Sequence, residues 1–171
     1  EYFSALRSHQ LWDLQPVRDL SYFWDLLWEP WLGTRAFMLT NIFILLGILI
    51  WIYRILGQVF SRSKGVQWAV VLFAAHPAVV NSVCWIAARK HLLSCFFILA
   101  ATSTFLDLIE RKPRSKAGLF TPVLAYGFSV LSQPITVLWP LWAWVRSRTT
   151  VGEARRRATA VVVATGTAGV V

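Results

Sequence analysis

The sequence predicts an all-α protein, a polytopic bundle of transmembrane helices with an amphipathic helix on its outer face and a short broken helical hairpin. Of its 171 residues, 57% are hydrophobic and 15% are charged, against roughly 25% charged residues in soluble domains. Several apolar runs approach the roughly 20 residues that cross a bilayer. The charges gather in short segments between these runs. Together these observations exclude an ordinary soluble domain.

The placement of charge predicts the orientation of the bundle. The formal net charge of +9 lies entirely within residues 54–64, 107–116 and 146–157, because the remaining acids and bases are equal in number. Short basic loops beside membrane spans stay in the cytoplasm. We therefore expect these three loops on the cytoplasmic side and residues 1–36 on the opposite side, and we expect no nucleic-acid binding.

Residues 1–36 form the predicted outer segment, and an amphipathic helix is expected within it. Apolar side chains recur there at helical spacing, which is typical of a helix lying in the membrane interface. The same stripe would also suit a contact with another membrane subunit, and this alternative stays open. The stripe comprises Leu20, Phe23, Trp24, Leu27, Trp28 and Trp31.

The bundle itself is expected over residues 37–171. The run 37–57 predicts the first span. A second span over 66–86 is broken at His76-Pro77, since proline removes a backbone hydrogen bond. We expect the chain to emerge near His76, continue as a short outer helix, and return inward over 91–110.

A broken hairpin is predicted next, because a single span over 119–145 would place two basic loops on opposite sides. The expected arms are 119–131 and 135–145, with Ser132-Gln133-Pro134 as the turn. Arms this short do not cross about 30 Å of hydrocarbon as straight helices. They are therefore expected to be buried among other helices or beside a polar cavity. A last outward span is expected over 158–171.

The candidate site lies at the outer ends of these helices. Ionisable residues and helix breaks at membrane depth mark functional sites, and paired cations there suit the phosphate of an anionic lipid. The alternative for the two cations is that they anchor a helix end at the interface. The predicted lipid-phosphate ligands are Arg89, Lys90, His76 and Gln133.

Other chemistry stays less favoured. No cofactor motif is present, and we predict no metal site. A pigment or haem held by His76 or His91 is an alternative, and a bound divalent metal is another. Cys84 and Cys95 flank the Arg89-Lys90 turn and could pair, whereas the simpler interpretation is two small apolar side chains.

Three stretches, in order, resemble signatures of membrane glycosyltransferases of the C superfamily (GT-C). The group concerned is the O-mannosyltransferase-like proteins that often carry tetratricopeptide repeats. The stretch HPAVVNSVCWIAARKHLLSCF is similar to that family's HP…VESVAW…RKD…LS…F pattern. QPVRDLSYFWDLLW with FMLTN resembles RPL…LSY…D followed by FHLTN, and FSVLSQPITVLWPL resembles LALLSKP…P. The matches cover roughly residues 12–145.

The resemblance implies a multi-span enzyme that takes a sugar from a polyprenyl-phosphate donor on the periplasmic or lumenal side. It implies a catalytic acid in a first outer loop upstream of these stretches, so we assign no catalytic residue here. Asp13, Asp19, Asp25 and Glu1 do not fall at the motif position. The chain begins without Met and ends in an apolar run, so we expect a fragment. Thirteen arginines against four lysines favour a bacterial inner membrane over the endoplasmic reticulum.

The departures from the pattern favour an alternative, namely a catalytically degenerate relative that serves as a structural or assembly subunit of a membrane complex. Polar positions have changed while the apolar framework is kept. Two lost cations weaken phosphate binding, and two lost carboxylates weaken acid-assisted transfer. The changed positions are Gln15, Met38, Asn81, His91 and Gln133.

Overall fold

The computed structural model describes residues 15–60, 63–110 and 117–168, and all the regular secondary structure in these ranges is helical. Within these ranges α-helices and short 3-10 helices follow one another with tight breaks, and no strand occurs. The elements are α2 (Pro16–Leu32), α3 (Arg35–Val59), α4 (Lys64–Ala75), α5 (Pro77–Cys84), η2 (Ile86–Ala88), α6 (Arg89–Glu110), α7 (Ala117–Ser132), η3 (Pro134–Leu138), α8 (Trp139–Arg148) and α9 (Glu153–Ala168).

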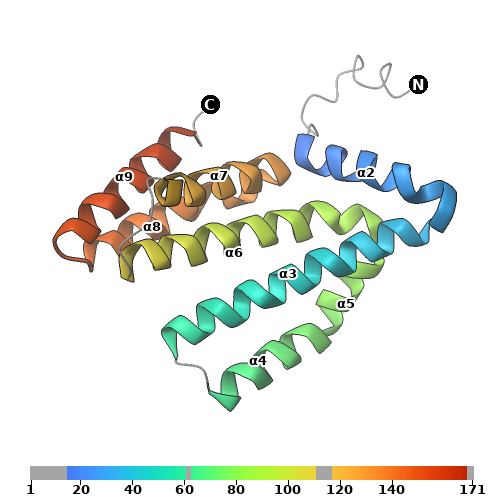
Figure 1. The fold of residues 1–171 in the computed structure, drawn as a ribbon, viewed down its shortest axis with the longest axis horizontal. Helices are drawn as coiled ribbons and strands as arrows, with labels where there is room; N and C mark the ends of the chain where they lie inside the picture. The colour runs from blue at the N-terminus through green and yellow to red at the C-terminus, as the bar shows by residue number, and fades with distance from the viewer. Residues whose placement is uncertain (1–14, 61–62, 111–116, 169–171) are drawn as a thin grey trace.

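Helix α6 is the centre of the arrangement (Figure 1). It packs against α3 on one side and α7 on the other, while α9 contacts α6, α7 and α8. Helix α2 contacts α3, α6 and α7 near the start of α6. The element that carries the candidate site, the first turn of α6, is therefore surrounded by helices from three parts of the sequence.

Two helices are long and apolar enough to cross a membrane, namely Arg35–Val59 and the continuous stretch Ile86–Glu110. The pair α4 and α5 passes the same test together, with a bend of 51° between its halves. Helix α7 is apolar but shorter. The predicted spans over 37–57 and 91–110 thus correspond to helices of suitable length, and the predicted span over 66–86 to the bent pair.

The break at His76-Pro77 has a local cause. Pro77 occupies the first turn of α5, where its missing N–H costs nothing, and the His76 ring Nδ1 accepts a hydrogen bond from the Ala78 N–H at 3.2 Å. This is an N-cap. Beyond this break α5 packs against α3, where Val83 meets Ile48. The expectation that the chain emerges from the membrane near His76 stays a prediction.

The predicted turn of the hairpin is confirmed at Gln133, whose extended backbone separates α7 from η3. The second arm begins as a 3-10 helix and continues as α8. Aromatic packing holds this arm against α6, since the Trp139 ring lies 5.6 Å from the Phe105 ring and 5.5 Å from the Tyr126 ring. All three side chains are buried.

Many large apolar side chains are exposed, unlike in a typical soluble protein. Large apolar side chains of α2, α3 and α4 point outward, with Trp31 85%, Phe43 69% and Leu72 68% exposed. The interior is largely apolar but also holds polar and charged side chains, since Asp25, Asn41 and Arg89 are at most 1% exposed. Exposed apolar patches of this extent mark a surface that another apolar phase or partner covers.

Helix α2 is confirmed as a helix, starting at Pro16, and its packing face is polar. The predicted apolar stripe is not covered by this chain: Leu20 and Phe23 are 71% and 62% exposed. The inward face carries Asp25, which is buried. A buried apolar face on this helix thus requires a membrane or another subunit.

Candidate functional site

The site is built around the guanidinium of Arg89, the first residue of α6. Its side chain is fully buried, and its N–H groups are directed at four different acceptors. Nε donates to Asn41 Oδ1 at 2.8 Å, one terminal nitrogen donates to the Asp25 carboxylate, and the other donates to the Phe37 carbonyl at 2.7 Å. The nitrogen that meets Asp25 also donates to the Ser21 carbonyl at 3.4 Å.

Asp25 and Asn41 extend this cluster to two further elements. The second carboxylate oxygen of Asp25 accepts a hydrogen bond from the Thr40 hydroxyl at 2.6 Å. The Asn41 amide nitrogen donates to the Val83 carbonyl near the end of α5, at 3.0 Å. We call the set Asp25, Thr40, Asn41 and Arg89 the buried junction. It connects α2, α3, α5 and α6.

Two aromatic rings enclose the cation. The Arg89 guanidinium carbon lies 4.7 Å from the Tyr22 ring centroid and 5.7 Å from that of Phe37. The Tyr22 hydroxyl donates to the Ile86 carbonyl at 2.7 Å. Burial raises the pKa of the Tyr22 phenol above its ordinary value, although the nearby Arg89 cation opposes this shift. The phenol therefore stays protonated and able to donate near neutral pH.

The ion pair between Asp25 and Arg89 in the buried junction has the additional hydrogen bonds that make a buried ion pair stable. Removing both charges from water is costly, and the attraction repays that cost only when the remaining hydrogen-bonding groups are satisfied. Here the guanidinium and the carboxylate both have additional partners. The contact between Arg89 and Asp25 therefore holds α2 against the start of α6.

Two of the three stretches that resemble the glycosyltransferase signatures meet in this junction, and the third, FSVLSQPITVLWPL, contributes no residue to it. Asp25 comes from the LSYFWD stretch, Thr40 and Asn41 come from FMLTN, and Arg89 comes from AARKH. Stretches that are separated by up to 64 residues in sequence are thus joined by direct side-chain contacts. Their polar residues belong to one structural unit.

The four predicted phosphate ligands lie on three elements: Arg89 and Lys90 begin α6, His76 is the N-cap of α5, and Gln133 lies between α7 and η3. No hydrogen bond or ion pair among the described residues joins Arg89, Lys90, His76 and Gln133 to one another. Arg89 is directed at Asp25, and His76 caps α5 roughly 10 Å along that helix from Val83. The grouping of all four in one phosphate site therefore has no support from these contacts.

Lys90 and Gln133 are the pair that the packing does bring to one level. Helices α6 and α7 are antiparallel neighbours, and the Ser129 hydroxyl donates to the Ser94 carbonyl at 2.9 Å. Lys90 precedes Ser94 by one turn and Gln133 follows Ser129 by one turn. Both side chains are half-buried. They lie at the same end of the helix pair as the buried junction.

An apolar groove of about 340 Å³ adjoins the junction between α2, α3 and α6. Thr40 lies at this groove as well as in the junction. Its walls are largely aromatic, and the Phe96 ring lies against α3 where residue 47 is a glycine: a Cβ there would come within 2.5 Å of the ring. The lining residues are Trp24, Thr40, Phe43, Ile44, Leu93, Phe96 and Phe97.

The altered motif positions lie outside the buried junction. Met38, Asn81 and His91 are exposed, whereas Gln15 is buried at the start of α2. His91 lies at a separate small cavity with Ser82 and Cys95. Cys84 and Cys95 are both free thiols.

Sequence reasoning missed the junction, because Asp25 entered it only as an acid outside the catalytic motif position and Asn41 only as part of FMLTN. One signal could have found it. Asp25 and Asn41 are each a lone polar side chain in a largely apolar helix, and such a side chain in a membrane requires a polar partner at the same depth. The Arg89 cation was the available partner.

In comparisons with known protein families, with characterised proteins and with solved structures, nothing matches this chain.

Proposed function

We propose that this chain is a polytopic module of a GT-C-type membrane glycosyltransferase that uses a polyprenyl-phosphate sugar donor on the periplasmic or lumenal side. The observation that supports this best is the buried junction. Residues from separate stretches, selected only because they resemble one family, contact one another directly. Unrelated chance similarities have no reason to converge in space.

The membrane placement rests on the polarity of the helices. Many large apolar side chains lie outside, while the charged pair Asp25 and Arg89 lies inside, as expected where lipid replaces water as the solvent. In this proposal α2 lies in the outer interface with its Trp-rich stripe toward lipid, and the basic segments 54–64, 107–116 and 146–157 lie in the cytoplasm.

The donor lipid is proposed to bind at the outer end of α6. Lys90 offers a half-buried ammonium for the phosphate, Gln133 offers an amide at the same level, and the aromatic groove beside Thr40 offers an apolar path for the prenyl chain. Arg89 acts as a positioning residue, because its contact with Asp25 fixes the turn that carries Lys90. The described residues contain no assigned catalytic acid.

A second candidate function is a structural subunit of a larger membrane complex. It is favoured by one observation: the Arg89 cation is already neutralised by Asp25 and buried. The motif positions 81, 91 and 133 hold no carboxylate or lysine. In that case the apolar stripe of α2 contacts a neighbouring subunit, and no donor lipid is bound.

Replacing Lys90 with glutamine should test the donor site. Each cation near a lipid phosphate contributes roughly fivefold to binding, so we expect the variant to retain about one fifth of the polyprenyl phosphate held by the unchanged chain. Native mass spectrometry of the purified full chain with added polyprenyl phosphate measures the bound fraction. Lys64→Gln, at the opposite end of the bundle, is the matched control and should bind as the unchanged chain does.

Two outcomes would contradict the proposal. The first is an unchanged chain that retains no more polyprenyl phosphate than a neutral polyprenol, which would favour the structural subunit. The second is an equal loss in Lys90→Gln and Lys64→Gln, because net charge rather than the outer site would then govern binding.

A further inference from the structure

One face of helix α9 packs against the bundle, and the opposite face is exposed. Ala158, Val161 and Thr165 are at most 1% exposed and pack toward α6, α7 and α8. The opposite side of the helix is exposed, with Val163 61% exposed. A hollow runs along this open side.

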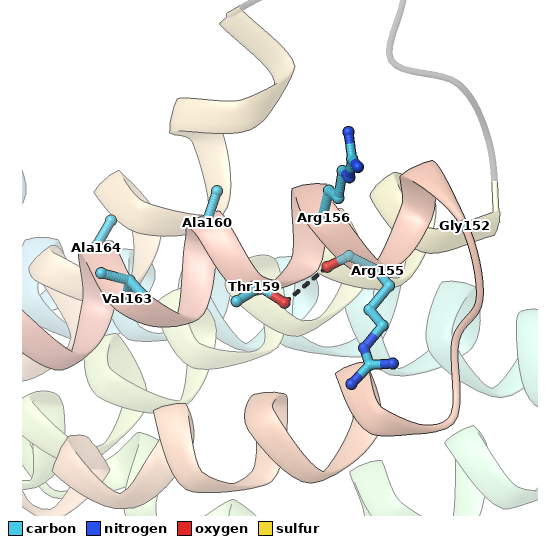
Figure 2. Close-up of a pocket in the computed structure, with 7 residues that line it drawn as sticks. All are labelled: Gly152, Arg155, Arg156, Thr159, Ala160, Val163 and Ala164. Carbon is cyan, nitrogen blue, oxygen red and sulfur yellow. Dashed lines mark hydrogen bonds between the residues drawn. The ribbon is translucent and has the colours of Figure 1, made fainter.

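That hollow is a shallow, open groove of about 740 Å³, whose lining residues all belong to α9 or to the turn that leads into it (Figure 2). Two rows of residues line it. One row is Arg156, Ala160 and Ala164, and the other is Arg155, Thr159 and Val163. Each row starts with an arginine and continues with small or apolar groups, so the groove is cationic at one end and apolar along its length.

Thr159 does not interrupt the apolar part of the groove. Its hydroxyl donates to the Arg155 carbonyl one turn earlier, at 2.8 Å, as the dashed line in Figure 2 marks. The donor is therefore used within the helix, and the side chain leaves its methyl group to line the groove.

The arginines near this end fall into two classes. Three are engaged within the chain: Arg146 donates to the Thr149 hydroxyl, Arg148 lies over the Trp144 ring, and Arg157 pairs with Glu153. Arg155 and Arg156 are exposed and have no acidic partner among the described residues. The two unpaired cations are the two that line the groove.

We infer that this groove binds an anionic phospholipid of the surrounding bilayer. Arg155 and Arg156 point to opposite sides of α9 (Figure 2), and a phosphate at this end takes charge-assisted hydrogen bonds from these exposed guanidinium groups. One acyl chain lies along the apolar rows toward Ala164. The distance from Arg156 to Ala164 is about 12 Å along the helix, which matches the upper part of an acyl chain. Basic residues at the cytoplasmic end of a membrane helix attract anionic headgroups.

A phosphate group is common to a phospholipid and to free phosphate, so the charged end of the groove alone would bind either one. The apolar part of the groove favours the phospholipid. Free phosphate uses only the cationic end, whereas a phospholipid also covers the apolar rows that water would otherwise meet. The inference rests on the membrane placement of α9 within the proposed function and is independent of sugar transfer, because it concerns the end of the bundle opposite Lys90.

Replacing both Arg155 and Arg156 with glutamine should weaken the binding of phosphatidylglycerol roughly 25-fold, since each cation near an anionic headgroup contributes about fivefold. Native mass spectrometry of the purified full chain in detergent, with phosphatidylglycerol or phosphatidylcholine added, measures the retained lipid. The unchanged chain should retain phosphatidylglycerol preferentially. Inorganic phosphate at the same concentration should not displace it.

The matched control removes the same charge elsewhere: Arg146→Gln with Arg148→Gln should keep the preference. A second variant, Ala160→Phe, fills the groove without changing charge and should also reduce retention of phosphatidylglycerol. Equal retention of both lipids by the unchanged chain would overturn the inference. Equal losses in the two double variants would overturn it too, as would displacement by inorganic phosphate. Failure here leaves the Lys90 result unaffected, so the two proposals are tested separately.

Discussion

Replacing Asp25 with alanine should destabilise the protein by about 3–5 kcal/mol, because this change leaves the Arg89 cation buried without a counter-charge. Both side chains are at most 1% exposed, so water does not take the place of the carboxylate. The free energy of unfolding, measured by denaturant titration in detergent micelles, checks the magnitude. Proteolysis within α2 should become faster as well, since α2 loses its main polar contact with the bundle.

The control for Asp25 is an ion pair of the same type at the surface. Glu153 pairs with Arg157 at 2.8 Å, and the Glu153 side chain is 78% exposed. Exposed pairs contribute at most about 1 kcal/mol, so Glu153→Ala should have little effect. The double change Asp25→Leu with Arg89→Met should be more stable than Asp25→Ala, because it removes both charges together. Equal, small effects of Asp25→Ala and Glu153→Ala would contradict the structural role of the junction.

Replacing Asn41 with leucine should cost about 2–3 kcal/mol. The Asn41 amide is the only described side chain that bridges the Arg89 guanidinium and the Val83 carbonyl. Hydrogen bonds to charged groups contribute about 1.5–3 kcal/mol, and the leucine removes the acceptor of the Arg89 Nε–H and the side-chain donor to the Val83 carbonyl. The same denaturant titration measures the change.

Ser129→Ala provides the comparison for Asn41. Its hydroxyl is also buried and bridges two helices, but both of its partners are neutral. Such interhelical hydrogen bonds average about 0.6 kcal/mol in membrane proteins. If Asn41→Leu proved no more destabilising than Ser129→Ala, the charge on Arg89 would have no part in the role of Asn41.

Much of the helical arrangement follows from the sequence, because apolar run length and proline placement are local properties. The run over 37–57 predicts α3, and the Ser132-Gln133-Pro134 turn predicts the break between α7 and η3. The break at His76 was also predicted, but the path of α5 was not. A local signal ends a helix there, whereas the packing of Val83 on Ile48, which keeps α5 beside α3, is a tertiary contact.

The candidate site was predictable only in its composition. The sequence identifies Arg89 as a cation at membrane depth, and the physics of burial requires a partner for it. The fold decides which acid pairs with Arg89. Asp25 is that acid because α2 crosses the start of α6, and this tertiary contact cannot be predicted from the spacing of apolar residues. The cationic groove on the exposed face of α9 was not predicted. Which arginines have partners within the chain depends on their contacts with Glu153, Thr149 and Trp144 in the folded protein.

The central claim is that the chain crosses a membrane with α2 on one side and the turn between α8 and α9 on the other. Cysteine accessibility tests it most directly. Glu29→Cys and Thr149→Cys are introduced separately after Cys84 and Cys95 are changed to alanine, and a membrane-impermeant maleimide is applied to intact cells and to inverted vesicles. We expect Glu29→Cys to be labelled only from outside and Thr149→Cys only from the cytoplasmic side. Labelling of both positions from the same side would contradict the account.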